Sequence, residues 1–204
     1  MRLIGMMDSP YVRRVAVSLK LLDLPFRHEP VSVFREYDRF AAINPVVKAP
    51  TLVTEAGTVL MDSGLMLEYA ERLAGPGRSL VPADPARFER SLRLTGLALA
   101  ACEKTVSIVY EKNQRPEEKQ HEPWLARVRG QMFAAYGALE DEMGDPGAWQ
   151  TGEHPMQADV AVAVAWRFTH HVLKDLDWPR RHPRLEAFSA RAEVLPAFAA
   201  TPLG

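Results

Sequence analysis

The chain has 204 residues, which is enough to bury a sizeable core as one domain or as two small ones. Its composition, 47% hydrophobic and 25% charged, is ordinary for a soluble globular protein, and its net charge of −1 gives no electrostatic reason to expect a nucleic-acid or membrane partner. The single cysteine, Cys102, excludes an internal disulfide framework and indicates a reducing compartment. No secretory signal is visible, so we expect a cytoplasmic protein.

The first third of the chain predicts a small mixed sheet with helices packed against it. Ser9 is a favourable N-cap and Pro10 a favourable first residue for one helix, and a second helix begins at Ser63. Residues 35–43 could form a short helix or a loop. A strand, a crossover helix and a second strand imply a parallel pair, and a hairpin with a turn at Gly57 adds antiparallel strands. The expected strands are residues 2–7, 26–33, 51–53 and 58–61.

The rest of the chain predicts helices. Glycine and proline in residues 74–79 indicate a linker, which gives a first domain at 1–75, a linker at 76–84 and an all-helical domain at 85–204. The run 160–165 alternates valine and alanine as a strand might, but every position is apolar, which favours a buried central helix. We expect the tail from Leu195 to be irregular. The expected helices are residues 85–113, 116–143, 155–174 and 183–192.

Four short motifs in this order resemble the glutathione transferase superfamily, over essentially the whole chain. The first is similar to the S-P-[FY]-V-R-[RK]-V segment of bacterial members that use a serine, and the others to N-P-x-G-[KQ]-V-P-x-L, to [ED]-S and to S-x-A-D. The matching stretches are Ser9–Val15, Asn44–Leu52, Asp62–Ser63 and Met156–Asp159. The resemblance implies an α+β thioredoxin-like N-terminal domain, with a mixed four-stranded sheet, followed by an all-α C-terminal helical bundle.

The resemblance also implies a glutathione site. The Ala49 backbone would pair with the cysteinyl residue of glutathione, which requires Pro50 to be cis. Lys48 would approach the glycyl carboxylate, with Arg35 as a second candidate. Ser63 and the helix behind it would hold the γ-glutamyl carboxylate, and Asp62 would accept from the ammonium. The alternative interpretation of Asp62-Ser63 is a plain helix cap.

The sequence departs from the family pattern at three positions. Val47 stands where the family has glycine, and Ala49 where it has valine. Met156 replaces the usual Ser or Thr cap of the central helix, and losing such a cap typically costs about 1 kcal/mol.

The resemblance makes Ser9 the catalytic residue. A free thiol has a pKa of about 8.5, and a hydroxyl donor at a helix N-terminus favours its anion. Ser9 could also simply cap its helix, and the two roles are compatible. With serine at position 9 and valine at position 12 there is no C-x-x-C pair, which disfavours disulfide exchange through a protein cysteine.

The electrophile pocket would lie between the domains, with Tyr11, Tyr110 and Trp166 as candidates. We expect no metal site, because the adjacent His170 and His171 point about 100° apart on a helix. Arg13 and Arg14 are interpreted as a solvated face or local ion pairs, or alternatively as a contact to a partner subunit.

We therefore expect a glutathione transferase whose co-substrate is glutathione and whose second substrate is a small hydrophobic electrophile. The expected assembly is a homodimer, without nucleic acid or membrane partners. One alternative is a non-catalytic glutathione-binding or protein-interaction module on the same fold. Another is a glutathione-dependent isomerase, dehalogenase or peroxidase, although Ser9-Pro10-Tyr11 departs from the cysteine-containing segment usual in zeta-type isomerases.

Overall fold

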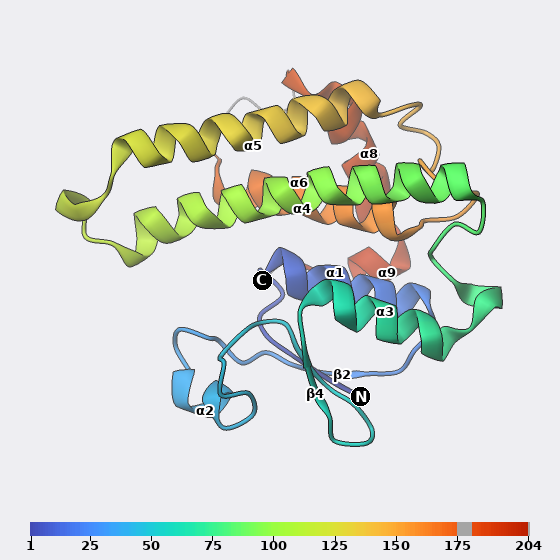
Figure 1. Ribbon diagram of the computed structural model, residues 1–204, viewed down its shortest axis with the longest axis horizontal. Coiled ribbons are helices and arrows are strands. Elements are labelled where there is room, and N and C mark those ends of the chain that lie inside the picture. Colours follow the sequence, from blue (N-terminus) through green and yellow to red (C-terminus); the bar gives the residue numbers. More distant parts are fainter. Residues whose placement is uncertain (175–180, 204) are drawn as a thin grey trace. The chain divides into compact units, whose positions relative to one another are not determined.

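The computed structural model describes residues 1–174 and 181–203 (Figure 1). The chain divides into two compact units, one formed by Met1–Val81 with Val194–Gly204 and the other by Pro82–Glu193. The first unit contains a four-stranded mixed sheet with helices and the second is helical, so the expected fold class is confirmed. The units differ from the expected domains in two respects: the expected linker 76–84 is divided after Val81, and residues 194–203, which we assigned to the helical domain, group with the first unit.

The sheet of the first unit has the strand order β2-β1-β3-β4. β1 and β2 run parallel, as the intervening helix predicts, whereas β3 is antiparallel to both β1 and β4. The segment 35–43 contains a short helix, α2. The strands are β1 (Arg2–Ile4), β2 (Arg27–Glu29), β3 (Thr51–Val53) and β4 (Val59–Met61), and the helices are α1 (Pro10–Leu21), α2 (Tyr37–Ala41), α3 (Ser63–Ala74) and the 3-10 turn η1 (Pro76–Arg78).

Alternate residues of the central strands face two different apolar clusters. Leu3 and its strand partner Leu52 belong to a cluster formed with α1 and α3, which pack against each other on that side (Figure 1). Ile4 and Val53 belong to a second cluster with Phe40 of α2. Because successive strand residues point to opposite faces, the sheet lies between a two-helix layer and the α2 segment.

The C-terminal segment packs on α1 and contains a short helix, α9 (Pro196–Ala199), rather than being irregular. Arg13 makes this contact: its Nε donates to the Thr201 carbonyl at 2.7 Å, and its guanidinium lies 5.8 Å from the ring centroid of Phe198. The expectation that Arg13 and Arg14 lie on a solvated face is wrong, because only 1% and 6% of their surfaces are exposed. Arg13 donates to backbone carbonyls and Arg14 Nη1 donates to the Ser63 hydroxyl, so protein oxygens take the place of water at these nitrogens.

The second unit is built around α6, which is buried on all sides from Ala158 to Trp166, as its apolar sequence predicts. Its helices are α4 (Pro85–Gln114), α5 (Glu122–Glu142), α6 (Gln157–Val172) and α8 (Pro183–Glu193), with the 3-10 turn η2 (Glu117–Lys119) before α5. α6 packs against α4 and α8. In the described part of the chain no helix is long and apolar enough to cross a membrane.

Met156 has no hydroxyl with which to cap α6, and the Asp159 side chain stabilises the start of this helix instead. Its two carboxylate oxygens accept from the backbone N–H of Gln150, at 2.8 Å, and from that of Met156, at 2.9 Å. The side chain therefore keeps one half of a capping box and also holds the preceding loop. Burial raises the pKa of Asp159 to about 6, although these hydrogen bonds oppose the shift.

The raised pKa of Asp159 predicts a pH-dependent stability. Between its ordinary value of 3.8 and about 6 the folded state binds more proton than the unfolded state, so stability falls as pH rises. We expect the free energy of unfolding of the wild type, relative to that of Asp159→Asn, to decrease by about 3 kcal/mol from pH ~3.5 to pH ~7. Urea denaturation of both proteins across this range measures the difference. A difference that is flat or increases with pH contradicts the prediction.

Candidate functional site

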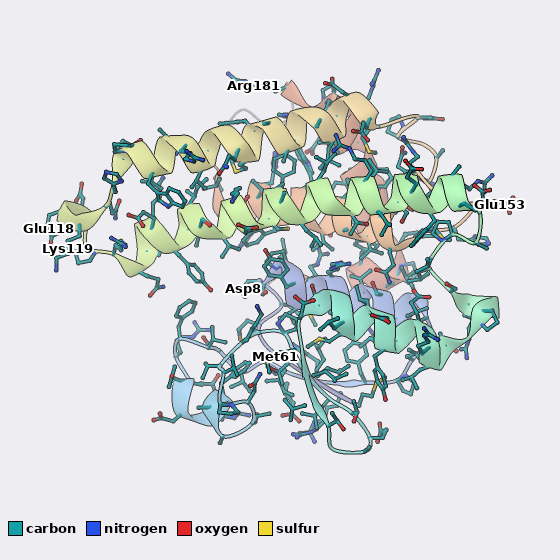
Figure 2. All side chains as sticks on the ribbon, viewed as in Figure 1. Asp8, Met61, Glu118, Lys119, Glu153 and Arg181 are labelled. Atoms are coloured by element: carbon teal, nitrogen blue, oxygen red, sulfur yellow. The ribbon has the colours of Figure 1, made fainter. Side chains whose placement is uncertain are left out.

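The residues that the sequence assigns to glutathione all lie in the first unit. They come from the start of α1, the turn before α2, the loop before β3 and the start of α3. Figure 2 labels Asp8 and Met61, which directly precede Ser9 and Asp62 in the chain. The assigned residues are Ser9, Arg35, Lys48, Ala49, Pro50, Asp62 and Ser63.

Ser9 is the N-cap of α1. Its backbone is extended, with φ −73° and ψ 123°, and its Oγ accepts from the Val12 N–H over a long 3.4 Å. The hydroxyl hydrogen is not used by this bond, so a half-buried Ser9 can donate to an anion placed at the helix start. The positive end of the helix dipole acts at the same point and favours negative charge there.

The loop before β3 lies next to the first turn of α1, because Gly5 occupies almost no space. Gly5 has φ +136°, and a Cβ at this position would lie 2.6 Å from Val12 Cγ2 and 3.2 Å from the Ala49 Cβ. A real side chain cannot fit at such distances, and few residues other than glycine adopt this φ. The end of β1, the start of α1 and Ala49 therefore meet at one place.

Asn44 and Thr51 hold the loop that carries Ala49 and Pro50. Asn44 Nδ2 donates to Thr51 Oγ1 at 2.8 Å, and Thr51 Oγ1 donates to the Lys48 carbonyl at 2.7 Å. Both side chains are buried, and the Ala49–Pro50 peptide bond is cis. Asn44 and Thr51 both belong to the second motif, which assigns them no role, although a polar residue on each side of a proline loop is a signal for such an internal bond.

Val47 has a positive φ of +52° within this loop. The left-handed region is favourable for glycine and strained for a β-branched residue. This explains in physical terms why the family pattern has glycine here, and why valine is a costly replacement. The Val47 side chain packs on the cluster that contains Ile4 and Phe40, which offsets part of that strain.

Asp62 and Ser63 begin α3 with different roles. Asp62 has φ +74°, and its Oδ1 accepts from the N–H groups of Gly64, at 2.8 Å, and Leu65, at 3.3 Å. Asp62 is therefore an exposed helix cap, as the alternative interpretation has it, and its second carboxylate oxygen faces no helix N–H. Ser63 is buried, and its Oγ accepts from Arg14 Nη1 at 3.1 Å. The motifs do not predict this arginine contact.

Lys48 and Arg35 are exposed. Lys48 is part of the loop that carries Ala49, whereas Arg35 lies in a turn whose Ser32 Oγ accepts from the Arg35 N–H at 3.2 Å. Glu36, beside Arg35, accepts from the Ser32 N–H and from Arg39, and these bonds lower the pKa of its carboxyl. The structure thus places two cations on separate loops of the first unit.

The three candidates for the electrophile pocket are divided between the units. Tyr11 is half-buried on α1 of the first unit, and Tyr110 is 46% exposed on α4 of the second. Trp166 is only 2% exposed, and its Nε1 donates to Glu186 Oε2 at 2.8 Å. Its ring meets Tyr136 edge-on at 5.3 Å, so Trp166 contributes to the interior of the second unit.

Among residues 1–174 and 181–203, no three His, Cys, Asp or Glu side chains gather as metal ligands would. His170 packs against the Trp166 ring, with centroids 5.1 Å apart, and burial lowers the pKa of its imidazole. Cys102 is buried on α4.

Comparison with known proteins gives consistent matches over both units. The model of the glutathione S-transferase N-terminal domain matches residues 3–78, and that of the C-terminal domain matches residues 122–191. The GST-like protein YibF of Escherichia coli, described as uncharacterized, is 30% identical over 81% of this chain and 80% of its own length. A maleylacetoacetate isomerase of Pseudomonas aeruginosa is 30% identical over 84% of this chain and 82% of its own.

Solved structures are similar over nearly the whole length. A glutathione S-transferase from Methylobacterium radiotolerans, in complex with glutathione sulfonate, has a TM-score of 0.89 at 30% identity and covers 98% of this chain and 93% of its own. A glutathione transferase family member from Pseudomonas fluorescens, with bound glutathione, has a TM-score of 0.85 at 29% identity. The match covers 100% of this chain and 98% of that protein.

The strained backbone at Val47 predicts that the glycine variant is more stable than the alanine variant, which is the reverse of the usual order. Glycine is ordinarily less stable than alanine by about 0.5–1 kcal/mol, because it loses more backbone entropy on folding. At φ +52° we expect Val47→Gly to be more stable than Val47→Ala by about 1 kcal/mol, since glycine removes the strain. The exposed neighbour Val46, whose φ is not positive, is the matched control, and there the alanine variant is expected to be the more stable. Urea denaturation of the four variants tests both orders, and a Val47→Gly protein less stable than Val47→Ala contradicts the prediction.

Proposed function

Because the chain belongs to the glutathione S-transferase superfamily, we propose that its first unit binds glutathione and activates the thiol for attack on a small hydrophobic electrophile. The observation that carries this proposal is the close approach of Gly5, Val12 and Ala49 beside the start of α1, the helix that Ser9 caps. A hydroxyl donor, a helix N-terminus and the backbone of the half-buried Ala49 therefore lie in one region of the first unit. The related structures with bound glutathione and glutathione sulfonate support the choice of ligand.

In the proposed complex, glutathione lies extended across the loop and the two helix starts. The Ala49 backbone pairs with the cysteinyl residue as an added strand would, on a loop that the buried Asn44 and Thr51 side chains hold in place. Lys48 provides the positive charge for the glycyl carboxylate. Ser63 and the start of α3 bind the γ-glutamyl carboxylate, and the open oxygen of Asp62 accepts from the ammonium.

The proposed chemistry is ionisation of the thiol followed by nucleophilic attack. Only a few per cent of a thiol with a pKa of about 8.5 is ionised at neutral pH. The Ser9 hydroxyl donates to the sulfur and the α1 dipole stabilises its negative charge, so the proton passes to solvent at a lower pH. The thiolate sulfur then forms a bond to the electrophilic atom. With serine at position 9, no protein cysteine takes part at this point.

Two further properties belong to the same proposal. The electrophile is small and hydrophobic, with Tyr11 and Tyr110 as candidate contacts. The protein acts in the cytoplasm as a homodimer, which is supported by the exposed leucines Leu65 and Leu73 on α3. Light scattering of the purified protein measures the assembly state.

A second candidate function is isomerisation with glutathione as a cofactor. The relative from Pseudomonas aeruginosa carries the name maleylacetoacetate isomerase, and it matches four fifths of this chain. The same activated thiolate could add to a conjugated double bond and leave again after rotation, so that glutathione is regenerated. Turnover of maleylacetoacetate without consumption of glutathione favours this candidate, and consumption of glutathione with a panel of electrophiles favours the transferase. Binding of glutathione without either turnover favours a binding module.

The role of Ser9 predicts a change in the bound thiol. We expect Ser9→Ala to raise the pKa of bound glutathione by about 1–2 units towards its free value, and to lower kcat/KM about 10- to 100-fold near neutral pH. Titration of the ultraviolet absorbance of the thiolate in the complex measures the pKa. Ser9→Thr keeps a hydroxyl and is expected to retain most of the effect. S-methylglutathione, which has no thiol to ionise, is expected to bind Ser9→Ala and Ser9→Thr about equally. An unchanged pKa in Ser9→Ala shows that the assignment is wrong.

A further inference from the structure

We infer that Arg14 is a positioning residue for the γ-glutamyl carboxylate, acting through Ser63. This inference rests on the proposed function and assigns a role to a buried charge that no part of the mechanism above uses. Arg14 lies on α1 and Ser63 on α3, and the side chains meet in the interior of the first unit.

The direction of the Arg14–Ser63 hydrogen bond determines what Ser63 can do. A guanidinium has only donors, so Arg14 Nη1 donates and Ser63 Oγ accepts, at 3.1 Å. One acceptor position of the hydroxyl is thus filled by a cation, and the hydroxyl hydrogen turns towards an acceptor elsewhere. Arg14 therefore presets Ser63 as a hydrogen-bond donor, which is the role that a carboxylate ligand requires.

The charge of Arg14 addresses a second problem at the start of α3. Asp62 fills the Gly64 and Leu65 N–H groups with its own carboxylate, and this negative charge repels a second carboxylate at the same helix start. The dipole of α3 alone is therefore a weakened anion site. The buried Arg14 guanidinium polarises the Ser63 hydroxyl that accepts from it, so Ser63 becomes a stronger donor to a carboxylate, and this effect is strong because only 6% of Arg14 is exposed to screening by water.

The adjacent arginine shows that this placement is particular to Arg14. Arg13 is equally buried, but it faces the C-terminal segment and donates to the carbonyls of Thr201 and Phe198. Arg13 and Arg14 thus have the same side chain and lie buried on the same helix, but they donate to different acceptors. Arg13 is therefore a matched control for the loss of a buried arginine from α1.

The test compares two ligands and measures their dissociation constants by calorimetry. One is S-methylglutathione, and the other is the same peptide with the α-carboxylate of the γ-glutamyl residue replaced by hydrogen. We expect Arg14→Met to weaken binding of S-methylglutathione about 10- to 100-fold and to change binding of the decarboxylated peptide less than about threefold. Arg14→Lys keeps a charge and is expected to recover part of the selective loss. Arg13→Met is expected to lower the melting temperature and to affect the two peptides equally.

A double-mutant cycle separates action through Ser63 from an independent effect. Because Arg14 acts through the Ser63 hydroxyl, the variant with both Arg14→Met and Ser63→Ala is expected to bind S-methylglutathione no more than about threefold more weakly than the weaker single variant. Circular dichroism confirms that each variant is folded, and Arg14→Lys serves if Arg14→Met does not fold. Equal losses of affinity for the two peptides, or additive losses of affinity in the cycle, overturn the role of Arg14 and leave the proposed function standing. A wild type that binds neither peptide overturns the proposed function and the Arg14 assignment with it.

Discussion

The close approach of chain segments at Gly5 is the constraint on which the first unit depends. Gly5 ends β1, and the absence of a side chain allows both Val12 of α1 and Ala49 of the cis-proline loop to lie against the same backbone atoms. A larger residue would separate the hydroxyl donor at the start of α1 from the loop backbone beside it. The relative position of these two groups is therefore set by backbone packing, which is stiffer than any arrangement of surface side chains.

Periodicity and turn residues were sufficient to predict the sheet, the hairpin and the buried central helix α6, because those elements are encoded by local pattern. The family motifs supplied the order of the two domains. The sequence could not show that Arg13 and Arg14 are buried, because a helix position becomes interior only when another segment covers it. The covering segments are α3 and residues 194–203, and the second of these is almost the whole chain away in sequence. Contacts between residues so far apart in the sequence do not alter the local hydrophobic periodicity.

Two strained residues, Val47 and Asp62, lie on either side of the β3–β4 hairpin. Each non-glycine residue at such φ values costs on the order of 1–3 kcal/mol, and it persists only where surrounding contacts fix the backbone. The Asn44–Thr51 bond provides those contacts at one end and the Asp62 cap provides them at the other. Backbone strain of this kind concentrates at ligand sites, and two of the three described non-glycine residues with positive φ fall in the segments proposed to hold glutathione, whereas the third, Asp23, lies in the turn after α1.

The return of residues 194–203 to the first unit makes that unit discontinuous in the chain. During synthesis, residues 1–81 leave the ribosome long before the segment that receives the Arg13 guanidinium exists. Until then the Arg13 guanidinium lacks the carbonyl acceptors of Thr201 and Phe198, and the face of α1 that residues 194–203 later cover is open to solvent. Residues 194–203 are translated after the whole second unit and yet complete the first, so that final consolidation of the proposed glutathione-binding unit follows, rather than precedes, synthesis of the helical unit.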